Sequence, residues 1–172
     1  MQAGRAISIE KIGAGDLSRV RALARRIWPE CFAGILPAGI IGPMVEAIYD
    51  LDVLRADMDA RSHIYWIAQV DGEDAGYASA YREADRLWIK KLYLLESSRG
   101  LGLGKRLIAT AQQELSGAKS LGLYVNDGNA SAIAFYKSQG FAIDRLEAVN
   151  MGGFEMKDYV MIRPVGSHAG GV

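Results

Sequence analysis

The segment SSRGLGLGK, residues 97–105, places three glycines at alternate positions between two cationic side chains. The apolar run before it, residues 92–95, predicts the end of a strand. The apolar residues after it recur at three- and four-residue spacing and predict a helix: Leu103, Leu107, Ile108, Ala111 and Leu115. A strand, a glycine turn and a helix in this order bring free amide groups and the positive end of a helix dipole together. The segment therefore predicts an anion site, with phosphate as the natural ligand.

Two common phosphate-binding motifs do not fit these residues. A P-loop requires glycine where Arg99 stands and serine or threonine where Arg106 stands. A dinucleotide fingerprint that starts at Gly100 requires glycine where Lys105 stands. A flexible loop or a simple helix cap is the structural alternative, because glycines beside helices often serve backbone geometry alone.

The bulk composition indicates one globular domain, which we expect to span residues 1–165, with a disordered glycine-rich tail at residues 166–172. The 20 basic and 20 acidic side chains cancel, so no global field favours nucleic acid or an anionic membrane. Cys31 is the single cysteine and fits a small buried hydrophobe. The first residues lack a signal peptide and a transmembrane stretch, so we expect a cytoplasmic protein, and we expect no metal.

The hydrophobic periodicity predicts mixed helices and strands. We expect strands at residues 6–11, 63–70, 75–82, 86–95, 120–125, 141–149 and 159–165, of which the second to fourth form an antiparallel meander. We expect a first helix that Asp16 caps and that stops near Pro29, then an irregular pair at residues 37–49, interrupted by Gly42 and Pro43, and at residues 53–60. Further helices are expected from Leu103 to a stop at Gly117 and at residues 130–138.

The spacing Arg-x-x-Gly-x-Gly at Arg99, Gly102 and Gly104 resembles the acetyl-CoA pyrophosphate loop of the GNAT superfamily of N-acetyltransferases. About thirty residues later, NASAIAFY at residues 129–136 is similar to the Asn-x-x-Ala-x-x-Phe-Tyr stretch of the same superfamily. The resemblance implies an α/β (α+β) GNAT fold. This fold has a mixed sheet of about seven strands, about four flanking helices, and two parallel strands, ending at Leu95 and Val125, that splay apart.

In this resemblance, backbone amides of the glycine segment wrap the pyrophosphate, Arg99 and Lys105 add positive charge, and the pantetheine arm occupies the gap between the splayed strands. On a helix capped by Asn129, the side chains of residues 129, 132 and 136 share one face. The residues implied to bind acetyl-CoA are Leu92, Leu94, Leu95, Arg99, Gly100, Leu101, Gly102, Leu103, Gly104, Lys105, Asn129, Ala132 and Tyr136.

The resemblance further implies that an acceptor amine attacks the thioester directly. The backbone N–H of Leu94 would stabilise the oxyanion, and Tyr136 would protonate the departing thiolate. The alternative for Tyr136 is an aromatic residue that anchors the core beside Phe135. Many family members place a glutamate on the strand before the loop, but this strand carries Lys90 and Lys91, so the sequence identifies no catalytic base. Among other titratable residues, Glu83 and Asp85 fit a solvated turn, and strand tyrosines usually pack.

For the acceptor, the candidate residues are Trp28, Phe32, Tyr81 and Tyr93, with core packing as the alternative for the first two. The segments at residues 34–50 and 150–161 resemble the PaiA-type branch, whose members acetylate polyamines. An acidic pocket would suit such an acceptor if Glu30, Glu46, Asp50 and Asp52 converge.

The predicted function is therefore acetyl-CoA-dependent N-acetylation of a small primary amine. A protein or peptide N-acetyltransferase and a non-catalytic acyl-CoA sensor are the alternatives. Family analogy and exposed sheet edges favour a homodimer.

Overall fold

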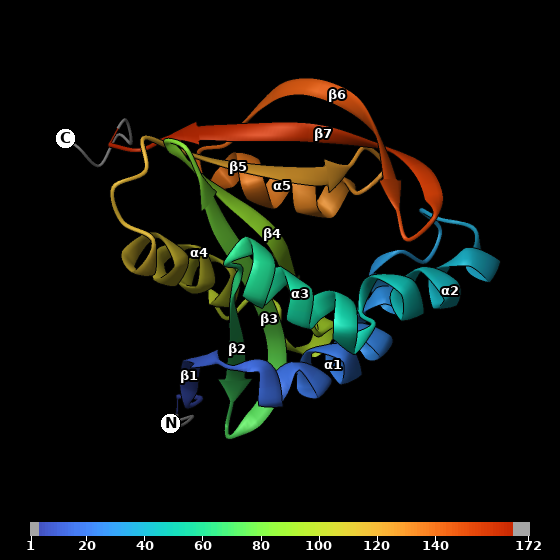
Figure 1. Ribbon diagram of the computed structural model, residues 1–172. Helices are drawn as coiled ribbons and strands as arrows, with labels where there is room; N and C mark the ends of the chain where they lie inside the picture. The colour runs from blue at the N-terminus through green and yellow to red at the C-terminus, as the bar shows by residue number, and fades with distance from the viewer. Residues whose placement is uncertain (1–3, 167–172) are drawn as a thin grey trace.

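The computed structural model describes residues 4–166, and its centre is one mixed sheet (Figure 1). The strands lie in the order β1-β2-β3-β4-β5-β7-β6, antiparallel except for the parallel pair β4 and β5. Their bounds are β1 Ile7–Ile12, β2 Ile64–Val70, β3 Glu73–Glu83, β4 Arg86–Leu94, β5 Ser120–Asn126, β6 Ala142–Met151 and β7 Phe154–Pro164. This arrangement confirms the predicted α/β fold class and the antiparallel meander.

Helices cover both faces of the sheet, because side chains of a strand point alternately to opposite sides. On β2, Tyr65 and Ile67 belong to one apolar cluster, whereas Trp66 and Ala68 belong to the other. The first cluster packs under α1 (Leu17–Cys31), α2 (Ala38–Ile48) and α3 (Leu51–Arg61), and the second packs under α4 (Leu103–Glu114) and α5 (Ala130–Ser138). Two short 3₁₀ turns, η1 (Ala14–Asp16) and η2 (Glu96–Ser98), precede α1 and the glycine segment.

The parallel strands β4 and β5 separate along their length. They pair from Arg86 and Ser120 only as far as Ile89 and Leu123, although both strands continue. A bulge helps to cause this separation, because Ser79 of β3 pairs with Lys91, Ala80 pairs with Ile89, and Lys90 is left over. The predicted splay is confirmed, and it opens the sheet directly before the glycine segment.

Helix α1 ends close to Pro29, as the sequence predicted, whereas Gly42 and Pro43 do not interrupt α2 as expected. Helix α1 continues through Pro29 to Cys31, and its last turn closes with a hydrogen bond from the Phe32 amide to the Trp28 carbonyl. Helix α2 continues through Pro43, where the buried Met44 and Val45 pack into the core and hold the turn together. Tertiary packing therefore outweighs the loss of one backbone hydrogen bond at each proline.

Several element ends also differ from the predictions. Helix α3 begins at Leu51 rather than at residue 53, because the Asp50 carboxylate caps it and accepts hydrogen bonds from the amides of residues 52 and 53. Asp16 does stand at the start of α1, but its side chain pairs with Arg19 instead of capping the helix. Helix α4 ends at Glu114, before Gly117, and β7 begins at Phe154 because a turn joins it to β6 as a hairpin.

The predicted tail lies outside the described residues, apart from Gly166. Within residues 4–166, no helix combines the length and apolar character needed to cross a bilayer.

Candidate active site

The glycine segment forms a cradle of backbone amides at the start of α4. Gly100 and Gly102 have φ values of +81° and +77°, which side-chain-bearing residues rarely adopt. Gly102 is the N-cap residue of α4, and no side chain of residues 4–166 caps this end. The first amide that bonds back to the Gly102 carbonyl is that of Arg106, at 3.1 Å. The amides of residues 103–105 are therefore left without acceptors inside the helix, as an anion site requires.

Gly104 has a different structural role from Gly100 and Gly102. Its backbone is helical, and a Cβ atom built on it would lie 2.8 Å from Cζ of Phe135 on α5. At Gly100 and Gly102, by contrast, an added Cβ would have no atom of the described residues within 4 Å, apart from the neighbouring residues in the chain. Gly104 therefore allows α4 and α5 to pack closely, while the other two glycines supply the left-handed backbone.

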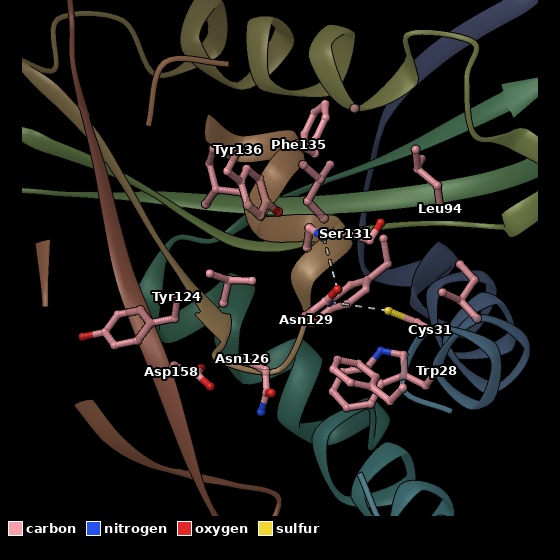
Figure 2. Close-up of a pocket in the computed structure, with 18 of the residues that line it drawn as sticks. Trp28, Cys31, Leu94, Tyr124, Asn126, Asn129, Ser131, Phe135, Tyr136 and Asp158 are labelled. Atoms are coloured by element: carbon pink, nitrogen blue, oxygen red, sulfur yellow. Dashed lines mark hydrogen bonds between the residues drawn. The ribbon is translucent and has the colours of Figure 1, made fainter. Parts of the chain in front are cut away.

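A cavity of about 340 Å³ extends from this cradle into the gap between β4 and β5. Figure 2 shows α5 on one side of it, with Asn129, Ser131 and Tyr136, and Trp28 and Cys31 of α1 on another side. Most of the residues that the sequence singled out line this cavity: Trp28, Phe32, Leu92, Tyr93, Leu94, Arg99, Gly100, Gly102, Leu103, Gly104, Asn129, Ala132 and Tyr136.

The backbone of Leu94 faces this gap. The amide of Leu95 donates to the Ala75 carbonyl on β3 at 2.8 Å. Because successive amides of a strand point in opposite directions, the Leu94 amide points away from β3. Strand β5 has already separated at this level, so this amide is available to a group inside the cavity.

Tyr136 lies in the wall of the cavity, and its ring packs against Phe135 and Phe141 at centroid distances of 5.3 and 5.7 Å. Burial, and to a lesser degree the Cys31 thiol, raises the pKa of its phenol above the usual range. The hydroxyl is therefore protonated at neutral pH. The two interpretations of Tyr136 are compatible, because one edge of the ring packs in the core while the residue also lines the cavity.

Asn129 caps α5 as predicted, with its side-chain oxygen accepting from the Ala132 amide at 3.2 Å. Its side-chain nitrogen lies 3.9 Å from Sγ of Cys31. Burial raises the pKa of the Cys31 thiol, whereas Arg99 and Asn129 lower it to a smaller extent. Cys31 is thus a half-buried thiol at the cavity wall, more exposed than the small buried hydrophobe that the sequence suggested.

Four of the predicted site residues lie outside the cavity lining. Leu95 and Leu101 pack in the two apolar clusters, and the Lys105 side chain is exposed, although its amide belongs to the cradle. Tyr81 stacks on His63 at 4.4 Å, beside a separate depression that Arg61 and Glu83 also line.

The four carboxylates expected to form an acidic pocket do not converge. Glu46 pairs with Arg25, Asp52 pairs with Arg55, Asp50 caps α3, and Glu30 is exposed on α1. None of the four lines the cavity.

The sequence interpretation missed a buried carboxylate, Asp158 of β7, which lines the cavity together with Asn126 of β5. A signal for it exists in the sequence. Met156, Asp158 and Val160 alternate along β7 and share one face, and a lone carboxylate among apolar residues on a strand face is unusual.

A split between parallel strands, an amide cradle at the mouth of the split and a tyrosine in its wall are together the features expected of an acetyl-CoA-dependent acetyltransferase. The family model for the acetyltransferase (GNAT) family matches residues 22–141. The chain belongs to this family, which confirms the predicted enzyme class, an N-acetyltransferase with acetyl-CoA as its cosubstrate.

Comparison with known proteins agrees with this assignment. An uncharacterized N-acetyltransferase of Mycobacterium tuberculosis is 34% identical over 161 residues, which cover 86% of this chain and 97% of the relative. The PaiA N-acetyltransferase of Thermoplasma acidophilum, solved in complex with coenzyme A, superposes with a TM-score of 0.79 at 23% identity, covering 92% of this chain and 99% of that one. The ribosomal-protein-S18-alanine N-acetyltransferase of Escherichia coli superposes with a TM-score of 0.70 at 18% identity, covering 97% of this chain and 99% of that one.

Proposed function

We propose that the chain transfers the acetyl group of acetyl-CoA to the primary amine of a small molecule, by direct attack of the amine on the thioester. The observation that carries this proposal is the continuity of one cavity. Four residues of the amide cradle (Gly100, Gly102, Leu103 and Gly104) border the same space as Leu94 and Tyr136.

The cradle fits the pyrophosphate of coenzyme A. Three helix-terminal amides and two left-handed glycines present N–H groups to an anion, and Arg99 adds a cation at the same end of the cavity. The gap between β4 and β5 is then the channel for the pantetheine arm, with Leu92 on one side and Ala132 on the other.

Two groups of the chain are positioned to assist the transfer. The Leu94 amide donates a hydrogen bond to the thioester carbonyl oxygen as negative charge develops on it. Tyr136, whose burial keeps the hydroxyl protonated, gives its proton to the departing sulfur. A thiol has an ordinary pKa of about 8.5, so a thiolate expelled into an apolar cavity is stabilised by this proton transfer.

The acceptor end of the cavity favours an amine with one cationic group over a polyamine. The walls there are mainly aromatic or contain methionine, and among residues 4–166 the lining contains a single carboxylate, that of Asp158. A polyamine carries several ammonium groups, and each needs a carboxylate or water when it is buried.

Release of free thiol from acetyl-CoA, followed with a thiol-reactive dye, tests the proposal across three acceptor classes. The panel contains 2-phenylethylamine, spermidine and a peptide with a free N-terminus. We expect turnover with the small monoamine to exceed turnover with the other two. If only the peptide among these three acceptors is acetylated, the protein is a protein acetyltransferase instead. Binding of acetyl-CoA without thiol release with any amine would identify a sensor.

A further inference from the structure

Asp158 is a buried carboxylate that faces the cavity, and no side chain among the described residues pairs with it directly. Its residue is 2% exposed, and among residues 4–166 its side chain has neither a hydrogen bond nor an ion pair within 4 Å. It stands on β7 directly opposite Asn126 of β5, so the two side chains point to the same face and into the same cavity (Figure 2). A buried charge without a partner is costly, and such groups concentrate at functional sites.

The surroundings of Asp158 make it a proton acceptor near neutral pH. Burial, and to a lesser degree the carboxylate of Asp127, raises its pKa from 3.8 to about 6, while Lys90 of β4 lowers it. Glu147 of β6 stands opposite Asp158 in the strand register, and Tyr93 of β4 lines the same cavity. A carboxylate with this pKa is ionised at pH 7 and is a stronger base than an ordinary aspartate.

Asp158 and Lys90 of β4 line the same cavity. Lys90 lies at the bulge and lines the cavity, in the strand where the sequence offered no carboxylate. Asp158 reaches the same cavity from β7, beyond the gap that separates β4 from β5. Within the described part of the chain, the cavity thus contains one carboxylate to pair with an ammonium group, together with Leu94 and Tyr136.

We propose that Asp158 is the catalytic base that removes a proton from the acceptor ammonium, and that the acceptor is a primary amine with an apolar body. This inference rests on the proposed function. One ammonium N–H bond breaks, an O–H bond forms on the Asp158 carboxylate, and the freed lone pair of the nitrogen attacks the thioester carbon. As the C–S bond breaks, Tyr136 protonates the sulfur and recovers a proton from the acylated nitrogen. Asp158 returns its proton to solvent, so one proton is released for each turnover.

The apolar body of the acceptor follows from the walls around the carboxylate. Trp28, Phe32 and Tyr93 pack together, with ring centroids 4.7 and 5.4 Å from Trp28. Met151 and Met156 complete this side of the cavity. Aromatic and thioether groups favour an apolar chain or ring, and an aromatic face also attracts an ammonium group.

The test compares Asp158→Asn with a matched control, Glu155→Gln. Glu155 is a carboxylate on the same strand, but it is exposed and does not line the cavity. With 2-phenylethylamine and acetyl-CoA at pH 7, we expect kcat to fall by about 100-fold or more in Asp158→Asn and to stay unchanged in Glu155→Gln. The kcat/KM of the wild type should level off above about pH 6, where Asp158 is ionised. In Asp158→Asn it should keep rising toward the pKa of the free amine.

A second measurement does not depend on turnover. In the absence of acetyl-CoA, 2-phenylethylamine should raise the melting temperature of the wild type and of Glu155→Gln, and should fail to do so in Asp158→Asn. If both variants match the wild type in rate and in this shift, the role of Asp158 is refuted. If the wild type turns over no amine, the proposed function fails. The amine-induced shift then still decides whether Asp158 binds an ammonium group.

Discussion

The close contact between α4 and α5 makes a testable prediction about Gly104→Ala. A new Cβ would lie 2.8, 3.3 and 3.4 Å from three ring atoms of Phe135. The ring lies against the helix backbone of α4 and belongs to the apolar layer under both helices. We therefore expect a substitution that normally strengthens a helix to weaken this protein.

The size of the effect follows from two opposing terms. Alanine in place of glycine inside a helix stabilises by about 1 kcal/mol. Overpacking a core contact costs about 1–3 kcal/mol, because the ring must leave its position. With about 2 kcal/mol for the clash, Gly104→Ala should lower the free energy of unfolding by about 1 kcal/mol. In a Phe135→Leu background the ring is absent, and the same substitution should stabilise by about 1 kcal/mol.

Urea unfolding of the wild type, both single variants and the double variant gives the coupling energy between the two positions, expected to be about 2 kcal/mol. The change of sign between the two backgrounds is the diagnostic result. If Gly104→Ala stabilises the protein equally in both backgrounds, then Phe135 does not exclude a side chain at position 104. That result would refute the proposal that Gly104 allows α4 and α5 to pack closely.

Three further predictions concern the proton donor, the cradle and a buried cation. Tyr136→Phe should reduce kcat by about 100-fold with unchanged affinity for coenzyme A, measured by thiol release and calorimetry, and full activity would exclude Tyr136 as the donor. Gly102 and Gly153 both have positive φ, at +77° and +89°. We therefore expect Gly102→Ala, and likewise the control Gly153→Ala, to lower the free energy of unfolding in urea by about 1–2 kcal/mol. Only Gly102→Ala should weaken coenzyme A binding, by about tenfold or more, and equal binding would argue against the cradle. Burial lowers the pKa of Lys91 to about 8, so the unfolded chain binds more protons above this pH. The free energy of unfolding should therefore rise by about 2 kcal/mol between pH 8 and 9.5, relative to Lys91→Met. The same pH dependence of the free energy of unfolding in the wild type and in Lys91→Met would contradict the lowered pKa of Lys91.

The sheet and the cofactor end of the cavity were predictable because their signals are local. Alternating apolar residues indicate strands wherever one or both faces are buried. The left-handed backbone at residues 100 and 102 favours glycine, so both positions can be recognised in the sequence. Asn129 is a helix cap whose hydrogen bond spans three residues. Each of these features depends on neighbours in the chain.

The acceptor end was not predictable in the same way, because it is assembled from distant segments. Asp158 reaches the cavity only because β7 inserts between β5 and β6, an order that no local pattern encodes. The helix that continues through Pro43 is also set by packing against the sheet, which local rules for proline do not include. Acidic residues on α2 and α3 were candidates by composition, but their partners Arg25 and Arg55 hold them at the surface.

A crystal structure of the chain with coenzyme A bound is the most direct test of the account as a whole. We expect pyrophosphate oxygens within hydrogen-bond distance of the amides of residues 100–105, and a thiol between the Leu94 amide and the Tyr136 hydroxyl. A pyrophosphate bound away from these amides, or a thiol outside the gap between β4 and β5, would contradict it.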